Sequence, residues 1–130
     1  MVLRFVLQFD RINLPEDSPA LRAEVREFLA AEAEHLARPN SDFGTGHDAE
    51  FSRKLGARGW IGMTWPKKYG GHERSYLDRY VVTEEFRAVT APTWGHFVAD
   101  RQSGPVILKY GSEKVKEEIL PRLGAPKIGR

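Results

Sequence analysis

The stretch that decides the fold is Leu55–Gly71, LGARGWIGMTWPKKYGG, which holds two of the chain's three tryptophans and a dense set of glycines. Glycine tolerates positive φ, so glycines at this density end helices. Trp60, Ile61, Met63 and Trp65 carry large apolar side chains, and burying such a side chain gains roughly 1.5–3 kcal/mol or more. We therefore expect a connection that aromatic anchors hold between helical flanks, and not a flexible linker.

Composition narrows the class of protein. The 130 residues suit a single domain with its own core. The net charge is +2, and basic and acidic residues are interleaved, so no basic stripe favours nucleic acid. There is no cysteine, which excludes disulfides and thiolate metal sites. No apolar run approaches the roughly 20 residues of a membrane span. A cytoplasmic protein without nucleic-acid or membrane partners is the simplest interpretation.

Helical spacing is clear on both sides of the central stretch. Residues 1–14 form an irregular lead-in, after which Ser18 and the following proline are good residues to open a helix. Apolar residues then recur at helical spacing until Pro39 closes the segment. A shorter helix is expected from about Asp48 to Arg58. The residues expected to face inward on the first helix are Leu21, Val25, Phe28, Leu29 and Leu36.

Further helical segments follow the central stretch. Ser75 opens one with an S-x-x-D capping pattern, and another starts near Thr93 until Gly104–Pro105 breaks or kinks it. A short helix ends at Gly111, and a last one is capped by Ser112 and stopped by Pro121. The residues expected to pack on the segment after Ser75 are Leu77, Tyr80, Val81, Phe86 and Ala88. The fold class predicted is all-α, an up-and-down bundle of five to six helices.

Several spacings imitate chemical motifs. Gly44–Ala49 fits G-x-G-x-x-A, but no strand precedes it, so a polar loop is favoured over a dinucleotide site. His72–Glu73 begins like H-E-x-x-H, yet Tyr76 stands where the second metal ligand must be. His35 and His47 have no partner that the sequence identifies. We therefore predict no metal site and assign no catalytic residue.

The segment Trp94–Pro105, WGHFVADRQSGP, is chemically the richest. At i, i+4 spacing His96 and Asp100 lie on one face of a helix that should be partly buried. Two alternatives remain open. One is a hydrogen-bonded network that ties helices together, since buried polar groups must be satisfied. The other is a pocket wall that faces a ligand.

Four blocks of the sequence carry a family resemblance. They are GWIGMTWPKKYGG (Gly59–Gly71), YVVTEEFRAVTAP (Tyr80–Pro92), ADRQSGPVILKYGSEKVKEEILPRL (Ala99–Leu123) and the first helix, PEDSPALRAEVREFLAAE. In their order and spacing they resemble the N-terminal helical domain of acyl-CoA dehydrogenases, over roughly residues 10 to 123. The first and third blocks look most like actinobacterial-type members, some of which act on bulky acyl chains such as steroid side chains.

The resemblance implies a flavoenzyme family that removes hydrogen across the α,β carbons of an acyl-CoA thioester, with FAD as hydride acceptor. In that family the carboxylate base lies in a C-terminal helical domain, and the flavin is held mainly by a middle β domain and a neighbouring subunit. The N-terminal domain contributes one wall of the acyl pocket. By position, the resemblance makes Trp94, His96, Asp100 and Arg101 the candidate pocket residues, and it places no catalytic or cofactor-binding residue in this chain.

The sequence departs from the family after Leu123, where it reads GAPKIGR over residues 124–130 instead of running on into the β domain. We expect a helical domain over residues 15–123 and a divergent tail, without the β and C-terminal domains. Such a chain should not dehydrogenate acyl-CoA alone and should hold FAD weakly, if at all. Glu84 and Glu85 are not expected to replace the base. The alternative is a non-catalytic module that joins a homo- or hetero-oligomer with a flavin-bearing subunit, or the product of a truncated gene.

Overall fold

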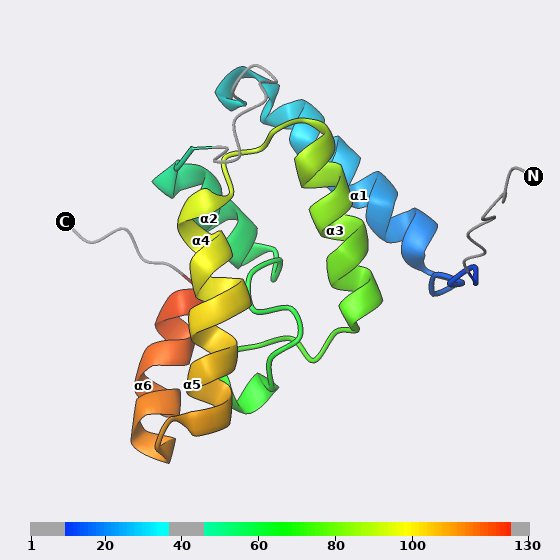
Figure 1. The fold of residues 1–130 in the computed structure, drawn as a ribbon. Helices are drawn as coiled ribbons and strands as arrows, with labels where there is room; N and C mark the ends of the chain where they lie inside the picture. The colour runs from blue at the N-terminus through cyan, green and yellow to red at the C-terminus, as the bar shows by residue number, and fades with distance from the viewer. Residues whose placement is uncertain (1–9, 37–45, 126–130) are drawn as a thin grey trace, which may run out of the picture.

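The computed structural model describes residues 10–36 and 46–125 (Figure 1). Its helices are α1 Ser18–Ala31, α2 Ala49–Ala57, α3 Tyr76–Ala88, α4 Trp94–Val98, α5 Gly104–Tyr110 and α6 Glu113–Gly124. Short turns η1 Ala33–His35 and η2 Lys67–Tyr69 are 3₁₀-helical, and η3 Ala99–Ser103 is a π-helix. The described residues contain no strand, so the all-α prediction is confirmed. None of their helices is both long and apolar enough to cross a membrane.

Local capping signals set the predicted starts of the later helices. Ser75 accepts the backbone N–H of Asp78, whose carboxylate accepts the N–H of Ser75, so the expected capping box is formed. Asp48 and Ser112 cap α2 and α6 by accepting the N–H three residues further on. Gly59 follows α2 with a φ of +73°, the left-handed conformation that favours glycine at a helix end.

Two helix ends differ from the prediction. α1 ends at Ala31, well before Pro39, because the chain tightens into the 3₁₀ turn η1, a common form of helix end. Leu36 follows that turn and still packs against the core. α6 does not stop at Pro121 but runs to Gly124. The proline lies in the last turns of the helix, where the N–H of Ala125 still donates to its carbonyl at 3.1 Å.

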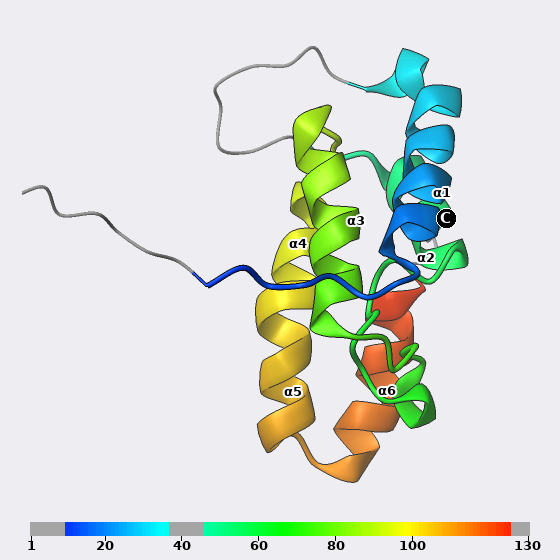
Figure 2. The same ribbon diagram turned by 90° about the vertical axis from the view of Figure 1, so that its right-hand side faces the viewer.

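The larger core lies where α1, α2 and α3 meet the central stretch. Figure 2 shows α1 and α3 side by side, with the chain of the central stretch passing beside them. Trp60 (4% exposed), Ile61 and Met63 (both 0%) point into this core, so the predicted aromatic anchoring is confirmed. The rings of Phe28 and Trp60 meet edge to face with centroids 5.2 Å apart, a favourable aromatic geometry.

The packing face of α3 is only partly as predicted. Tyr80 is 53% exposed and Ala88 is also exposed, whereas Val82 and Glu85 are buried. Glu85 forms ion pairs with two arginines of α1, including Arg26 at 2.7 Å. These pairs satisfy a carboxylate that could not otherwise be buried. The buried stripe of α3 is therefore rotated toward α1 and includes a polar residue that a purely apolar pattern misses.

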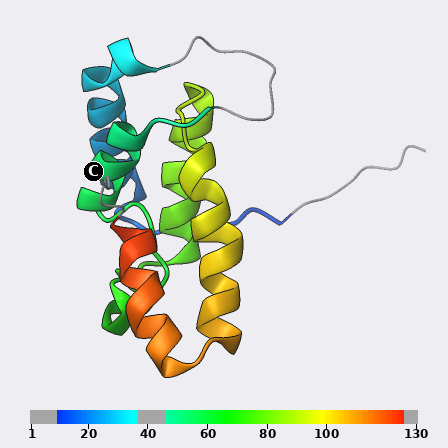
Figure 3. The same ribbon diagram turned by 90° about the vertical axis from the view of Figure 1, so that its left-hand side faces the viewer.

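A smaller core joins α5, α6 and η2 (Figure 3). Trp65 (1% exposed), Tyr69 and Leu120 are its buried hydrophobic members. Of the expected break or kink at Gly104–Pro105, the break does not occur, because the π-helix η3 carries α4 directly into α5. Gly104 lies so close to Trp65 that a Cβ there would be 2.2 Å from Cζ2 of the indole. This close approach fixes the rod formed by residues 94–110 against the central stretch.

Candidate functional site

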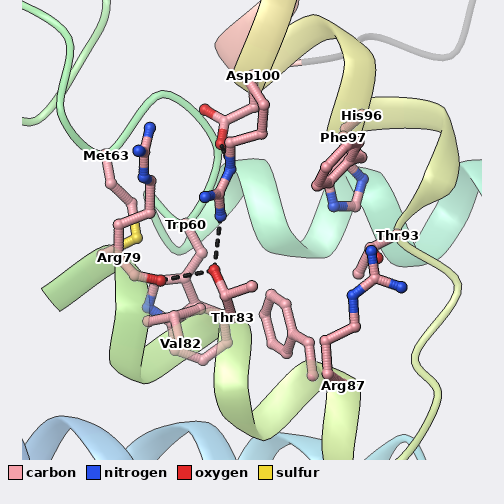
Figure 4. Close-up of a pocket in the computed structure, with 12 residues that line it drawn as sticks. Trp60, Met63, Arg79, Val82, Thr83, Arg87, Thr93, His96, Phe97 and Asp100 are labelled. Atoms are coloured by element: carbon pink, nitrogen blue, oxygen red, sulfur yellow. Dashed lines mark hydrogen bonds and ion pairs between the residues drawn. The ribbon is translucent and has the colours of Figure 1, made fainter. Parts of the chain in front are cut away.

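A small cavity of about 30 Å³ lies between α3 and the rod (Figure 4). This space holds about one or two water molecules. Its polar lining residues come from both sides: Arg79, Thr83, Arg87, Thr93, His96, Asp100 and Arg101. Its apolar lining residues are Trp60, Met63, Val82, Phe86 and Phe97. The cavity therefore combines an aromatic and aliphatic wall with an unusual number of cationic groups.

A hydrogen-bonded network crosses the cavity wall. Asp100 is 5% exposed and accepts the backbone N–H of Gly62 at 2.8 Å. It also accepts Nε of Arg101 at 2.9 Å, and Nη2 of the same guanidinium donates to Thr83 Oγ1 at 2.6 Å. The Thr83 hydroxyl in turn donates to the carbonyl of Arg79 at 2.6 Å. The network links the central stretch, the π-helix and α3, so it supports the structural alternative for Asp100.

His96 is held in its neutral form by burial. Its Nδ1 lies 2.9 Å from Oγ of Ser52 on α2, and Ser52 is itself 5% exposed. Burial lowers the pKa of His96 to about 4, and the positive charge of Arg101 acts in the same direction. The imidazole therefore serves as a neutral hydrogen-bonding group near pH 7. Burial also lowers the pKa of Arg101, and the nearby Arg79 adds to that effect.

The structure brings together three of the four residues that the sequence singled out. His96, Asp100 and Arg101 all line the cavity, but Trp94 does not. Trp94 is 37% exposed and stacks on Phe97, with ring centroids 5.8 Å apart. It is therefore a partly exposed neighbour of the cavity-lining Phe97 and not part of the lining itself.

Sequence reasoning missed the contribution of α3. Arg79, Thr83 and Arg87 follow one another at i, i+4 and i+8 and line the cavity from the same helix face. That spacing is visible in the sequence, but nothing there says that this face meets the segment after Thr93. The partners of Asp100 and His96 are likewise 38 and 44 residues away along the chain.

This cavity does not fit a metal or a flavin. No group of three His, Asp or Glu residues suited to a metal ion occurs in the described part of the chain. The cavity is far too small for an isoalloxazine ring, so we derive no step through FAD. Glu84 and Glu85 both pair with Arg22 on α1, which gives them a structural place. The G-x-G-x-x-A spacing begins in residues 37–45, which lie outside the described residues.

Solved structures share this helical arrangement. The crystal structure of the ChsE4-ChsE5 complex from Mycobacterium tuberculosis superposes with a TM-score of 0.70 at 30% identity. The match covers 89% of this chain and 29% of that one. A structure described as the Tcur3481-Tcur3483 steroid ACAD also gives 0.70, at 31% identity over 89% of this chain and 30% of that one. The fold is therefore that of a helical domain found in these structures.

Sequence comparison gives the family. The model of the acyl-CoA dehydrogenase N-terminal domain matches residues 15–126. Acyl-CoA dehydrogenase FadE26 of Mycobacterium tuberculosis is 31% identical over 121 residues, which cover 88% of this chain and 30% of that protein. The chain belongs to the acyl-CoA dehydrogenase family and corresponds to its N-terminal domain. It spans about 30% of the length of FadE26 and of the Tcur3481-Tcur3483 chain that it matches.

Proposed function

We propose that this chain forms one wall of the acyl pocket of an FAD-dependent acyl-CoA dehydrogenase, which desaturates acyl-CoA thioesters at the α,β carbons. The observation that carries the proposal is the family match over residues 15–126. The wall would be the first part of the rod, from Trp94 to Arg101. It carries the stacked rings of Trp94 and Phe97, and the cavity lies beside Phe97. The residues of the chain would bind and orient the acyl group, and the chemistry would belong to domains outside residues 15–123.

Three features of the wall support the proposal: an apolar surface and two hydrogen-bonded side chains. The stacked rings of Trp94 and Phe97 offer an apolar surface to a hydrocarbon chain, and aromatic faces exclude water from it. Asp100 is already bonded to Gly62 and Arg101, so it holds the wall in shape. His96 is bonded to Ser52 and neutral, so it adds no charge to an apolar site. We further expect the acyl group of the substrate to be bulky, as a steroid side chain is.

The 130-residue chain itself can test the wall. Titration with a medium-chain acyl-CoA should shift the amide NMR resonances of residues 93–101, whereas free coenzyme A should not. Trp94→Ala should weaken binding of the acyl-CoA, and Tyr80→Ala, an exposed aromatic residue on α3, is the matched control. Equal shifts with free coenzyme A would contradict the proposal. Purified chain that carries flavin absorbance and turns over an acyl-CoA would contradict the expectation that it is inactive alone.

One observation favours the second candidate, a helical subunit that joins a flavin-bearing subunit. Four large hydrophobic side chains of the rod, termed its apolar stripe, are exposed: Trp94 37%, Val98 38%, Val106 56% and Tyr110 74%. Exposed apolar side chains that form a contiguous patch are typical of an interaction surface. The similar ChsE4-ChsE5 structure is itself described as a complex. Co-expression with a full-length acyl-CoA dehydrogenase should give co-purification, which a Val106→Ser, Tyr110→Ser double variant should abolish. Failure of the unaltered chain to co-purify would count against this role.

A further inference from the structure

A second opening, termed the α3–α5 groove, lies between the start of α3 and α5. Its lining residues come from the central stretch, from the first turn of α3 and from the rod. Its volume is about 470 Å³, within the usual size range of ligand sites. Tyr76, Pro105 and Lys109 line it and are exposed, so the groove is open to solvent.

Cations line this groove, and no carboxylate is among its lining residues. The cations are Arg79, Arg101 and Lys109. Arg101 is already paired with Asp100, a buried carboxylate. Arg79 and Lys109 form no ion pair within the described part of the chain, and each lies over a tyrosine ring, at 4.8 and 5.0 Å from the centroid. Two cations of the groove are therefore left without a counter-charge there.

The remainder of the sequence has little to neutralise this charge. Residues 1–9, 37–45 and 126–130 lie outside the described residues, and Asp42 is the single acidic side chain among them. Burial lowers the pKa of Arg101, and the positive charge of Arg79 lowers it further. A carboxylate brought into the groove would offset that repulsion and accept charge-assisted hydrogen bonds. The charge of the groove therefore favours an anionic partner.

One lining residue also holds an unsatisfied hydrogen-bond donor. Trp65 lines the groove and is 1% exposed, and its indole Nε1 has no hydrogen-bond partner among the described residues. Buried polar groups are normally hydrogen-bonded, and one that is left unsatisfied costs free energy. A ligand that brings an oxygen acceptor to this indole would remove that cost. This observation is independent of the charges and points to the same place.

The uncharged part of the lining favours a polypeptide over a small inorganic anion. Tryptophan, tyrosine and arginine are the residue types enriched in protein interfaces, and the groove presents all three. Pro105 and Leu108 add aliphatic surface beside the cations. An inorganic anion would leave that surface in water, whereas a peptide segment can cover it with an apolar side chain and still place carboxylates on the cations.

We propose that the α3–α5 groove binds an acidic segment of a partner protein. Its carboxylates pair with Arg79 and Lys109, and an apolar side chain of the segment packs against Pro105 and Leu108. The inference goes beyond the proposed acyl wall and does not depend on it, since its test uses no thioester.

A matched pair of blocked peptides tests the inference on the 130-residue chain. One peptide alternates glutamate with leucine, and the other has glutamine in place of each glutamate, so the two differ in charge. By calorimetric titration the glutamate peptide should bind about fivefold more tightly, a preference that two exposed ion pairs can supply. Raising the salt concentration to about 0.5 M should remove most of that preference, because salt screens exposed charges.

Charge-removing variants locate the binding site. Arg79→Gln and Lys109→Gln should each reduce the preference for the glutamate peptide severalfold. Lys114→Gln on α6 makes the same change of charge at an exposed lysine that does not line the groove, so it should keep the preference. Thermal unfolding of the three variants separates loss of binding from loss of folding. Because Lys109 is exposed, Lys109→Gln keeps the test decisive even if Arg79→Gln is unstable.

The three tryptophans give a readout that does not depend on affinity. The indole N–H cross-peak of Trp65, identified by its absence from Trp65→Phe, should shift when the glutamate peptide binds and the donor gains an acceptor. The cross-peaks of Trp60 in the larger core and of Trp94 on the apolar stripe should stay in place.

Four outcomes would overturn the proposal. The first is equal affinity for the two peptides, or a loss of preference in Lys114→Gln as large as in Lys109→Gln. The second is a shift of the Trp94 cross-peak without one of Trp65, which would place the peptide on the apolar stripe. Inorganic phosphate that binds as tightly as the glutamate peptide would make the groove a site for free anions. Sedimentation that shows a dimer unable to bind the peptide would make a second copy of the chain the occupant.

Discussion

The two halves of the molecule are stabilised very differently. Where α1, α2 and α3 meet the central stretch, thirteen hydrophobic residues are buried in one cluster. Where α5, α6 and η2 meet, the buried hydrophobic residues are Trp65, Tyr69 and Leu120. Since burial of apolar area is the dominant favourable term in folding, the first half has the larger share of the stabilisation. The second half packs a smaller cluster around the indole of Trp65, and the backbone at Gly104 lies close against that indole.

The surfaces of the two halves differ in the same sense. In the first half, ion pairs link side chains on the surfaces of α1 and α3, such as Arg22 and Glu84 at 2.7 Å. In the second half the rod exposes the apolar stripe that includes Val106 and Tyr110. The difference teaches that the two halves differ mainly in how much apolar area they bury, and the exposed residues of the rod are those that the second candidate function would cover. Four predictions test this contrast.

The largest effect is expected in the larger core. Phe51 is 1% exposed and packs against Phe28 and Phe86. Phe51→Ala should lower the free energy of unfolding by about 3–5 kcal/mol, the usual loss for a buried aromatic residue. Denaturant titration measures it, with Tyr80→Ala as the exposed aromatic control. A loss below about 1 kcal/mol would contradict the assignment of this cluster as the main source of stability.

The next effect belongs to the smaller core. In Gly104→Ala the new Cβ would lie 2.2 Å from Cζ2 of Trp65 and 2.9 Å from the carbonyl of Ala99, so the rod must shift. We expect a loss of about 1–3 kcal/mol, as in other overpacked cores. Hydrogen exchange should show faster exchange in α5 and α6 but not in α1 and α3. Ser103→Ala, at an exposed neighbouring position, is the control. Equal acceleration in both halves would show that they unfold together.

His96 of α4, whose hydrogen-bond partner is Ser52 of α2, should make stability depend on pH. Its pKa falls from the ordinary 6.5 to about 4 on folding, so between these values the unfolded chain binds the proton more readily. The free energy of unfolding should therefore decrease by roughly 2 kcal/mol as the pH drops from about 7 to about 4. His96→Asn should flatten this dependence, and exposed His72→Asn should not. A slope that persists in His96→Asn would assign the acid sensitivity to other groups.

The smallest effect is expected on the apolar stripe. Val106→Ser and Tyr110→Ser remove side chains that are 56% and 74% exposed, so each should change the free energy of unfolding by less than about 0.5 kcal/mol. Val81→Ser, at a position that is 0% exposed, is the contrasting variant and should cost several times more. Marked destabilisation by the stripe variants would mean that the stripe packs within the chain and is not a surface for a partner.

What the sequence predicted well depends on local chemistry. The capping box of Ser75 and Asp78 lies within four residues, and the glycine after α2 needs only its own φ. Trp60 and Trp65 are too large and apolar to remain in water, so their burial could be predicted without knowing their neighbours. The helical spacing of apolar residues gave the all-α arrangement, and the family blocks agreed with it. Features of this kind are set within one or two helical turns.

What the sequence did not predict depends on distant partners. The choice of Val82 and Glu85 over Tyr80 and Ala88 as the buried face of α3 follows from where the arginines of α1 lie. The cavity exists only because α3 lies beside the rod. A turn joins α3 to the rod, and the residues of that turn do not by themselves determine its direction. Proline rules predicted a break or a kink at Pro105, but the chain stays helical from the π-helix into α5.

That π-helix also acts as a one-residue insertion in the rod. Each residue of an α-helix advances the side chains by about 100° around its axis. An extra residue in a regular α-helix would therefore turn everything after it by that angle, whereas the wider π turn over Ala99–Ser103 takes the extra residue up locally. Deleting one residue there should restore an ordinary α-helical turn and leave Leu108 facing the smaller core, whereas deleting one residue within α5 should rotate the residues that follow it away from that core.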